Sequence, residues 1–157
     1  MKTINLLIGI LKIGAGLSLL GMVALTCADV IGGLFDRPIL GSEEIVSLMG
    51  AILLAFALPV TQAEKGHIGV DLLYRLFPDR VKTGTDICIS LIGCLFFFVA
   101  AWQSFLYARE IKAVGQVSAT IQFPVHYVIY GVFLGCLVLA LVILAELVDL
   151  LRGHTDE

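Results

Sequence analysis

Four long, mostly apolar stretches constrain this chain more than any other feature of its sequence. They cover residues 7–34, 43–63, 85–108 and 124–150. The hydrocarbon core of a bilayer is about 30 Å thick, and a helix needs about 20 mostly apolar residues to cross it. Each stretch has that length, so the sequence predicts an all-α, integral membrane four-helix bundle. We expect residues 1–157 to form a single four-span membrane domain.

The overall composition agrees with a membrane protein. Hydrophobic residues make up 59% of the 157 residues, and the mean hydropathy is +1.02. Soluble domains are only about 45–50% apolar. The net charge of −3 comes without a block of basic residues. Such blocks are typical of segments that bind nucleic acids, so we expect no nucleic acid among the partners.

Basic residues are divided unevenly between the two sides of the expected bundle. With the N-terminus inside the cell, seven Lys and Arg residues fall on the cytoplasmic side and three fall outside. Cytoplasmic loops collect Lys and Arg, so we expect both termini to be cytoplasmic. The outer residues are Arg37, Arg109 and Lys112. The inner residues are Lys2, Lys12, Lys65, Arg75, Arg80, Lys82 and Arg152.

The connector between the second and third spans, residues 64–82, has an amphipathic pattern. Its apolar residues Val70, Leu73, Tyr74 and Phe77 recur at helical spacing and would form one apolar face. A helix with such a face lies in the plane of the membrane interface. We therefore expect a short interfacial helix in this cytoplasmic connector.

The first span carries small residues on one face and an acid near its outer end. Gly14, Ser18 and Gly21 recur at helical spacing, which lets another helix approach closely. Two interpretations are open: this face packs within the bundle, or it docks a separate protein. Carboxylates inside membranes are usually paired or face a polar cavity. Asp29 is therefore expected to be an interfacial or paired structural carboxylate, with an ion or proton pathway as the alternative.

The second span opens with polar residues at the membrane surface. Ser42 is predicted to be the N-cap, and Glu43 and Glu44 in the first turn suit the positive end of the helix dipole. This structural role accounts for both acids. Two carboxylates at a membrane surface would also be able to meet basic groups on a partner protein.

The sequence lacks the groupings that enzymes and cofactor sites require. Its four cysteines lie within the predicted spans, and none forms a Cys-x-x-Cys motif. His67 and His126 are expected on opposite sides of the membrane, so they would not share a haem or a metal. The middle of the third and fourth spans has no polar groups of the kind that line transport pathways. We expect no enzyme activity and no cofactor, but an accessory or scaffold subunit whose partner carries the chemistry.

One group of short sequence segments is more characteristic of a particular protein family than the features above. Its most specific member is His67-Ile68-Gly69-Val70-Asp71, which follows an uncharged span. Further segments are Arg37, Glu43-Glu44, residues 55–57, 64–66 and 72–73, Phe77-Pro78 and residues 118–124. In this order and spacing they resemble the small membrane subunit, the Q-type small permease, of tripartite ATP-independent periplasmic (TRAP) transporters. The resemblance covers nearly the whole chain, from the first span to the fourth.

The resemblance implies a role in uptake of organic acids (carboxylates) coupled to inward sodium movement. It implies a large membrane subunit that holds substrate and sodium, and a periplasmic substrate-binding protein that delivers the substrate. Sodium is then expected on the large subunit and not on this chain. The small subunit would act as a scaffold in the bacterial inner (cytoplasmic) membrane, surrounded by membrane lipids.

We hypothesise that the first two spans hold the large subunit. On the outer side the contacts would come from Arg37, Glu43 and Glu44, and on the inner side from His67 and Asp71. His67 and Asp71 would alternatively only fix the fold of the connector. The remaining candidates for this partner interface are Asp29, Gly14, Ser18 and Gly21.

Two functions from other classes stay open at this point. One is a haem-type membrane anchor of a respiratory enzyme, which predicts haem absorption by the purified protein. The other is a self-assembling four-helix channel or exporter, which predicts transport by this chain alone in liposomes.

Overall fold

The computed structural model describes residues 2–64 and 79–153, and in these residues it contains four long helices and no β-strand. The all-α prediction is confirmed. In chain order the helices are α1 (Lys2–Leu34), α2 (Ser42–Ala63), α4 (Asp79–Val114) and α5 (His126–Gly153). The interfacial helix predicted for the connector lies outside the described residues.

Each helix contains a segment long and apolar enough to cross a membrane. These segments are Leu6–Leu34, Ser42–Ala63, Ile87–Val114 and His126–Leu150. At about 1.5 Å per residue, even the shortest spans roughly 33 Å, which matches a hydrocarbon core of about 30 Å. The chain is therefore a multi-pass membrane protein, as its sequence predicted.

The ends of several helices differ from the ends of the predicted spans, including the starts of α1 and α4. The third helix continues to Val114, beyond the predicted end at residue 108, because Arg109, Glu110 and Lys112 extend it as polar turns. The fourth helix begins at His126 and not at residue 124. Pro124 instead pairs with Val117 in an isolated antiparallel bridge within the preceding loop.

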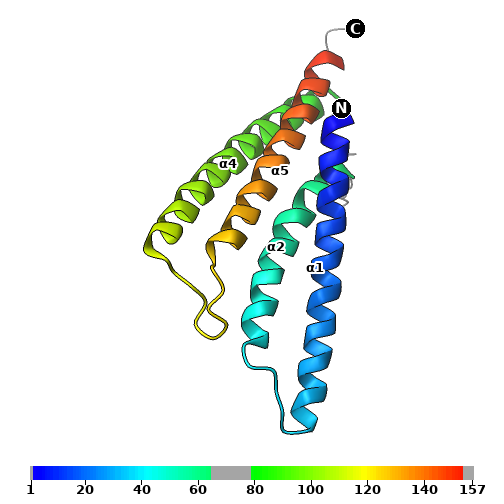
Figure 1. Ribbon diagram of the computed structural model, residues 1–157. Coiled ribbons are helices and arrows are strands. Elements are labelled where there is room, and N and C mark those ends of the chain that lie inside the picture. Colours follow the sequence, from blue (N-terminus) through cyan, green and yellow to red (C-terminus); the bar gives the residue numbers. More distant parts are fainter. Residues whose placement is uncertain (1, 65–78, 154–157) are drawn as a thin grey trace.

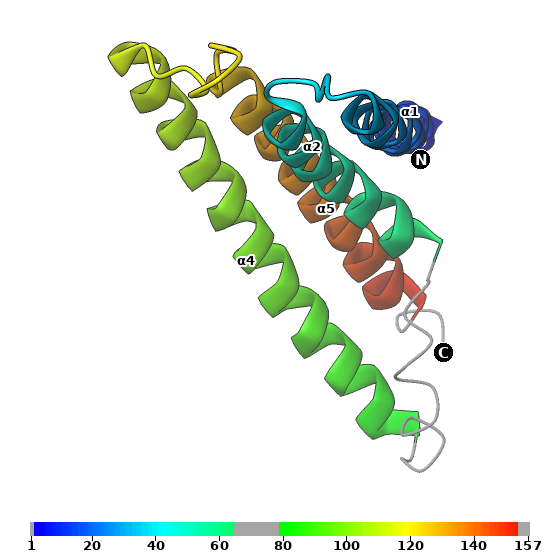
Figure 2. The ribbon, with the colours of Figure 1, turned by 90° about the horizontal axis from the view of Figure 1, so that it is seen from below.

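The helices lie side by side in the order α4, α5, α2 and α1, so α4 and α1 form the two edges (Figure 1). Figure 2 shows the same order from below. Helix α1 packs along α2 and touches α5 over only a short stretch. The start of α1 and the end of α5 lie at one end, which we call the terminal end (Figure 1). The loops 35–41 and 115–125 lie at the other end, which we call the loop end.

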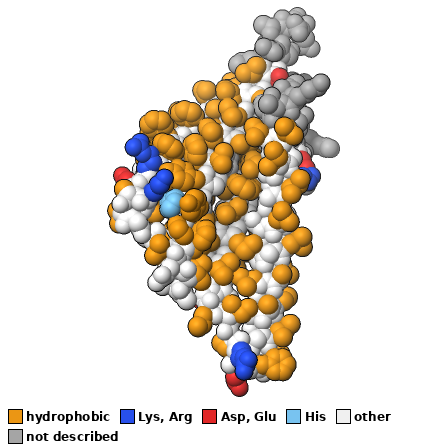
Figure 3. Space-filling model, in the orientation of Figure 1, with side chains coloured by type: hydrophobic (Ala, Val, Ile, Leu, Met, Phe, Trp, Pro, Cys, Tyr) orange, Lys and Arg blue, Asp and Glu red, His pale blue; other side chains and the backbone are white. Residues whose placement is uncertain are grey.

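Helix α5 forms the centre of this arrangement and is the most buried of the four. Its residues Val138 and Val142 join Leu11 of α1 and Val60 of α2 in one buried cluster. Many large apolar side chains on the other helices are exposed, and apolar groups spread over much of the face seen in Figure 3. Lipid tails cover such a surface in a membrane, since hydrocarbon is as apolar as leucine.

Small residues set how closely the helices approach. A Cβ added at Gly14 would lie 3.0 Å from the Phe56 ring, and one at Gly21 would overlap Met49. Both glycines of the first span therefore face α2, and Ser18 between them is partly buried. These contacts favour packing within the bundle over docking of a separate protein as the use of this face.

Candidate functional site

The loop end gathers the polar residues that the sequence predicted for the outer surface. Asp29, near the end of α1, accepts a hydrogen bond from the backbone N–H of Ile39 at 2.8 Å. The N–H of Arg37 donates to the Gly32 carbonyl at 2.9 Å, which also ties the loop to α1. Asp29 thus holds the loop 35–41 against α1 through a backbone hydrogen bond, and Arg37 is an exposed side chain on that loop.

Glu44 is held by the loop between α4 and α5. The hydroxyl groups of Ser118 and Thr120 both donate to its carboxylate. The Thr120 N–H lies 3.1 Å from each carboxylate oxygen, and the Ile121 N–H lies 3.4 Å from one of them. Two backbone amides and two hydroxyls thus converge on one acid. The sequence did not assign these roles, because the partners lie 74 to 77 residues apart in the chain.

The loop that surrounds Glu44 has a compact shape of its own. The Ser118 N–H donates to the Phe123 carbonyl at 2.9 Å, which closes the turn beside the Val117–Pro124 bridge. Gln122 adopts a positive φ of 53° within this turn. The turn directs the amides of residues 120 and 121 toward the start of α2.

The start of α2 differs from the predicted N-cap. Gly41 is the capping residue, with a left-handed φ of 83° and no side-chain hydrogen bond to the helix. Ser42 is instead the first helical residue and is buried. Glycine is required here for two reasons: it tolerates positive φ, and a Cβ would lie 2.6 Å from Ile121. The two acids follow in the first turn, as predicted.

Two hollows border the paired acids at the loop end. The larger, of about 480 Å³, lies between the start of α2 and residues 116–119. The smaller, of about 360 Å³, lies between Asp29 and residues 38–42. Both are lined by Glu43 and Glu44. Because the side chain of Glu43 is exposed, it is the acid that is accessible to a partner.

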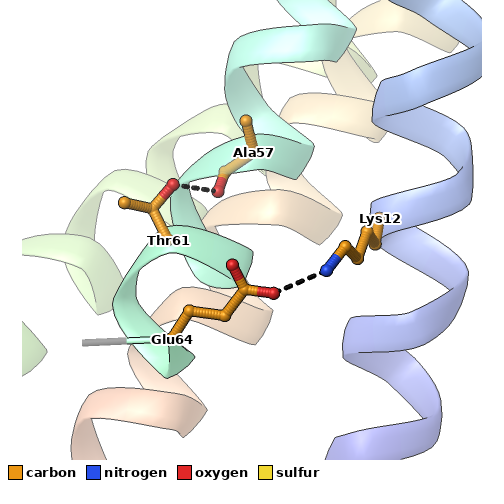
Figure 4. Close-up of polar contacts among 4 residues, drawn as sticks. All are labelled: Lys12, Ala57, Thr61 and Glu64. Atoms are coloured by element: carbon orange, nitrogen blue, oxygen red, sulfur yellow. Dashed lines mark hydrogen bonds and ion pairs between the residues drawn. The ribbon is translucent and has the colours of Figure 1, made fainter. Parts of the chain in front are cut away.

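Polar contacts also join the helices near the terminal end. The Lys12 ammonium on α1 lies 2.6 Å from a carboxylate oxygen of Glu64, just after α2 (Figure 4). The Gln62 amide donates to the Glu146 carboxylate of α5 at 2.7 Å. Helix α2 is thereby tied to both of its neighbours. Sequence reasoning missed both contacts because their partners are 52 and 84 residues apart.

Exchanging the charges of the exposed Lys12–Glu64 pair tests its contribution. We expect Lys12→Glu alone to lower the free energy of unfolding by about 1 kcal/mol, because it places two carboxylates together. The double variant Lys12→Glu/Glu64→Lys should recover most of that loss. Thermal unfolding in detergent measures both effects. A double variant no more stable than the single one would contradict a direct interaction.

The inner candidates His67 and Asp71 lie outside the described residues, so their predicted contacts remain predictions. Within residues 2–64 and 79–153, no three His, Cys, Asp or Glu side chains are grouped to hold a metal ion. The contacts at both ends instead connect helices and loops. This geometry is suited to holding helices and presenting a surface to other proteins.

Comparison with known proteins agrees with this description. A profile of the family described as "Tripartite ATP-independent periplasmic transporters, DctQ component" matches residues 22–153. The match includes residues 22–34 at the end of α1, all of the other three helices and both loops at the loop end. No curated protein matches the chain. The chain therefore belongs to the DctQ family, the small membrane component of TRAP transporters, and is a transporter subunit and not an enzyme.

Proposed function

We propose that this chain is the scaffold subunit of a sodium-coupled TRAP transporter for organic acids. It would hold a large membrane subunit and help to receive a periplasmic substrate-binding protein in the bacterial inner membrane. The observation that carries the scaffold role is the apolar character of the central helix. Between Tyr130 and Glu146, α5 contains no charged or amide side chain.

A transport pathway needs interrupted helices and polar groups near the middle of the membrane. The described parts of α2 and α5 do not show them. Substrate and ion sites in transporters usually lie near the middle of the membrane, on interrupted helices with polar groups. Here α2 continues through Pro59, and α5 is unbroken. The two hollows described above lie at the loop end of the helices. We propose that substrate and sodium bind to the large subunit and that this chain carries no cofactor.

The distribution of charge supports both termini in the cytoplasm. Arg37 follows α1 and Lys112 lies in the last turn of α4, so both belong to the loop end. This end carries fewer basic residues than the other, as expected of an outer surface. The loop end would then face the periplasm, with Glu43 and Arg37 available to the partner proteins. Lipids would cover the remaining apolar surface of the edge helices.

The first test is purification with a tag on the C-terminus, followed by identification of the subunits that accompany the chain. We expect a much larger polytopic membrane protein in stoichiometric amount. Purification of the chain by itself, or with haem, flavin or iron–sulfur subunits, would overturn the proposal. The first of these results would return attention to a self-assembling channel, and the second to a respiratory membrane anchor.

Charge reversal at Glu43 tests the predicted outer interface. We expect Glu43→Lys to reduce recovery of the large subunit, or uptake by the assembled transporter, by about tenfold, because it places a like charge opposite a basic partner. Glu110→Lys is the matched control, because Glu110 is also an exposed acid at the loop end but lies on α4. Equal behaviour of the two variants would remove Glu43 from the interface.

A further inference from the structure

We infer that the two adjacent acids at the start of α2 have different roles. Glu44 is a positioning residue that holds loop 115–125 in the shape that a partner protein recognises. Glu43 is the acid left for direct contact with that partner. The recognition part of this inference rests on the proposed function, whereas the positioning part depends only on the contacts within this chain.

The chemistry of the Glu44 contacts favours an ionised carboxylate. All the groups directed at it donate: two backbone N–H groups and two hydroxyls. An ionised carboxylate is an acceptor at both oxygens, so it satisfies them all. A glutamine has the same size but presents an NH₂ group in place of one oxygen. That group is a donor at one of the two oxygen positions, so glutamine keeps only one of the two oxygens that accept from the loop.

The Glu44 hydrogen bonds also matter because they join helices that are not neighbours in the order α4, α5, α2 and α1. Helix α4 is an edge helix that packs against α5. Loop 115–125 connects these two helices, and Glu44 lies on α2, on the other side of α5. At the loop end, the Glu44 contacts therefore tie α2 to the connection between α4 and α5. Gly41 adds a second contact from the same helix start, because its Cα faces Ile121.

The held loop presents an exposed surface beyond Glu44. Gln116, Val117, Ala119 and Phe123 are all exposed, and the first three of these line the larger hollow. The surface combines apolar and amide groups with the neighbouring acid Glu43. A partner suited to it is a protein that brings an apolar contact and a basic side chain. A loop held in one conformation loses less conformational entropy when it binds such a partner.

Hydrogen exchange with matched variants tests the positioning role. The full chain, purified with whatever subunits accompany it, would be compared as wild type, Glu44→Gln and Glu43→Gln. Each variant removes one carboxylate, and the two positions are neighbours, so the variants differ only in the hydrogen bonds that each substitution breaks. We expect the amides of Thr120 and Ile121 to exchange about tenfold faster in Glu44→Gln, since this variant replaces one of the two oxygens that accept from the loop with a donor. Glu43→Gln should leave their exchange unchanged.

A second measurement separates positioning from direct contact. The loop variant Ser118→Ala/Thr120→Val removes both hydroxyl donors and leaves every acid in place. It should reduce recovery of the large subunit as Glu44→Gln does, and combining the two should add little, because both act on one set of contacts. Fully additive losses would overturn the inference that Glu44 acts through the loop.

The remaining outcomes are also decisive. Unchanged exchange in Glu44→Gln would overturn the positioning role. Faster exchange with full recovery of the large subunit would overturn the recognition role. If no large subunit accompanies the wild-type chain, the proposed function fails, yet the exchange comparison still decides whether Glu44 positions the loop.

Discussion

Replacing Gly135 with leucine is expected to separate α5 from α2 and to destabilise the packing of the four helices severely. A Cβ at this position would overlap the Ala55 carbonyl oxygen, and it would lie 2.7 Å from the carbonyl carbon and 2.9 Å from the Ala55 Cβ. The first two obstacles are backbone atoms, which cannot rotate away as a side chain can. We expect Gly135→Leu to cost at least about 3 kcal/mol, at the upper end of the range for overpacked cores.

A glycine on the same helix supplies the control for this variant. Gly131 lies one turn earlier and also faces α2, but a Cβ there would lie 3.7 Å from the Ile52 side chain, which is ordinary contact. Thermal unfolding in detergent should therefore show a loss of roughly 10 °C for Gly135→Leu and a much smaller change for Gly131→Ala. A pair of Gly135→Ala and Gly131→Ala gives the same comparison at constant side-chain size. Equal stability of that pair would show that the backbone contact is not limiting.

Replacing Gly41 with valine is expected to disrupt the start of α2 and its contact with the neighbouring loop. Gly41 has a φ of 83°, and a Cβ there would lie 2.6 Å from the Ile121 side chain. A β-branched residue carries the left-handed penalty of about 1–2 kcal/mol and must also displace Ile121. We expect a total loss of about 3 kcal/mol in the free energy of unfolding.

Gly115→Val isolates the backbone part of that loss. Gly115 has a similar positive φ of 69°, but a Cβ there would meet no atom within 4 Å. This variant should cost only the left-handed penalty of about 1–2 kcal/mol. The difference between the two valine variants, measured by thermal unfolding, reports the steric cost of a side chain placed against Ile121. If the two variants are destabilised equally, Ile121 does not restrict position 41.

Several features of the fold were predictable because the bilayer imposes them. A membrane-spanning segment must satisfy its backbone hydrogen bonds within itself, so long apolar stretches become helices. Residues 7–34 and 43–63 accordingly match α1 and α2 within a few residues. Helix α4 extends beyond its predicted span at both ends, and α5 begins two residues after its predicted start. Polar residues such as Glu110 continue a helix beyond the lipid, where hydropathy does not mark its end.

The candidate site was predictable only in part. Asp29, Glu43 and Glu44 were identified from their position near the membrane surface, and the structure places all three beside one hollow. Their individual roles did not follow from the sequence. Glu43 and Glu44 are identical side chains one residue apart, and helical geometry turns only one of them toward the loop at residues 118–121. Ser42, the predicted N-cap, is buried because Gly41 reverses the chain before it.

The sequence by itself determined that this protein has four membrane-length helices, because hydropathy and segment length follow from local composition. Its short segments also indicated the TRAP transporter family. Only the tertiary structure decided which helix is central and which glycines are essential to packing. It also decided which acid, Glu44, forms hydrogen bonds within the chain. Gly131 and Gly135 show the reason: both lie on α5, yet one faces a flexible side chain and the other faces backbone. Such differences depend on which atoms of distant segments meet, and local sequence does not specify those contacts.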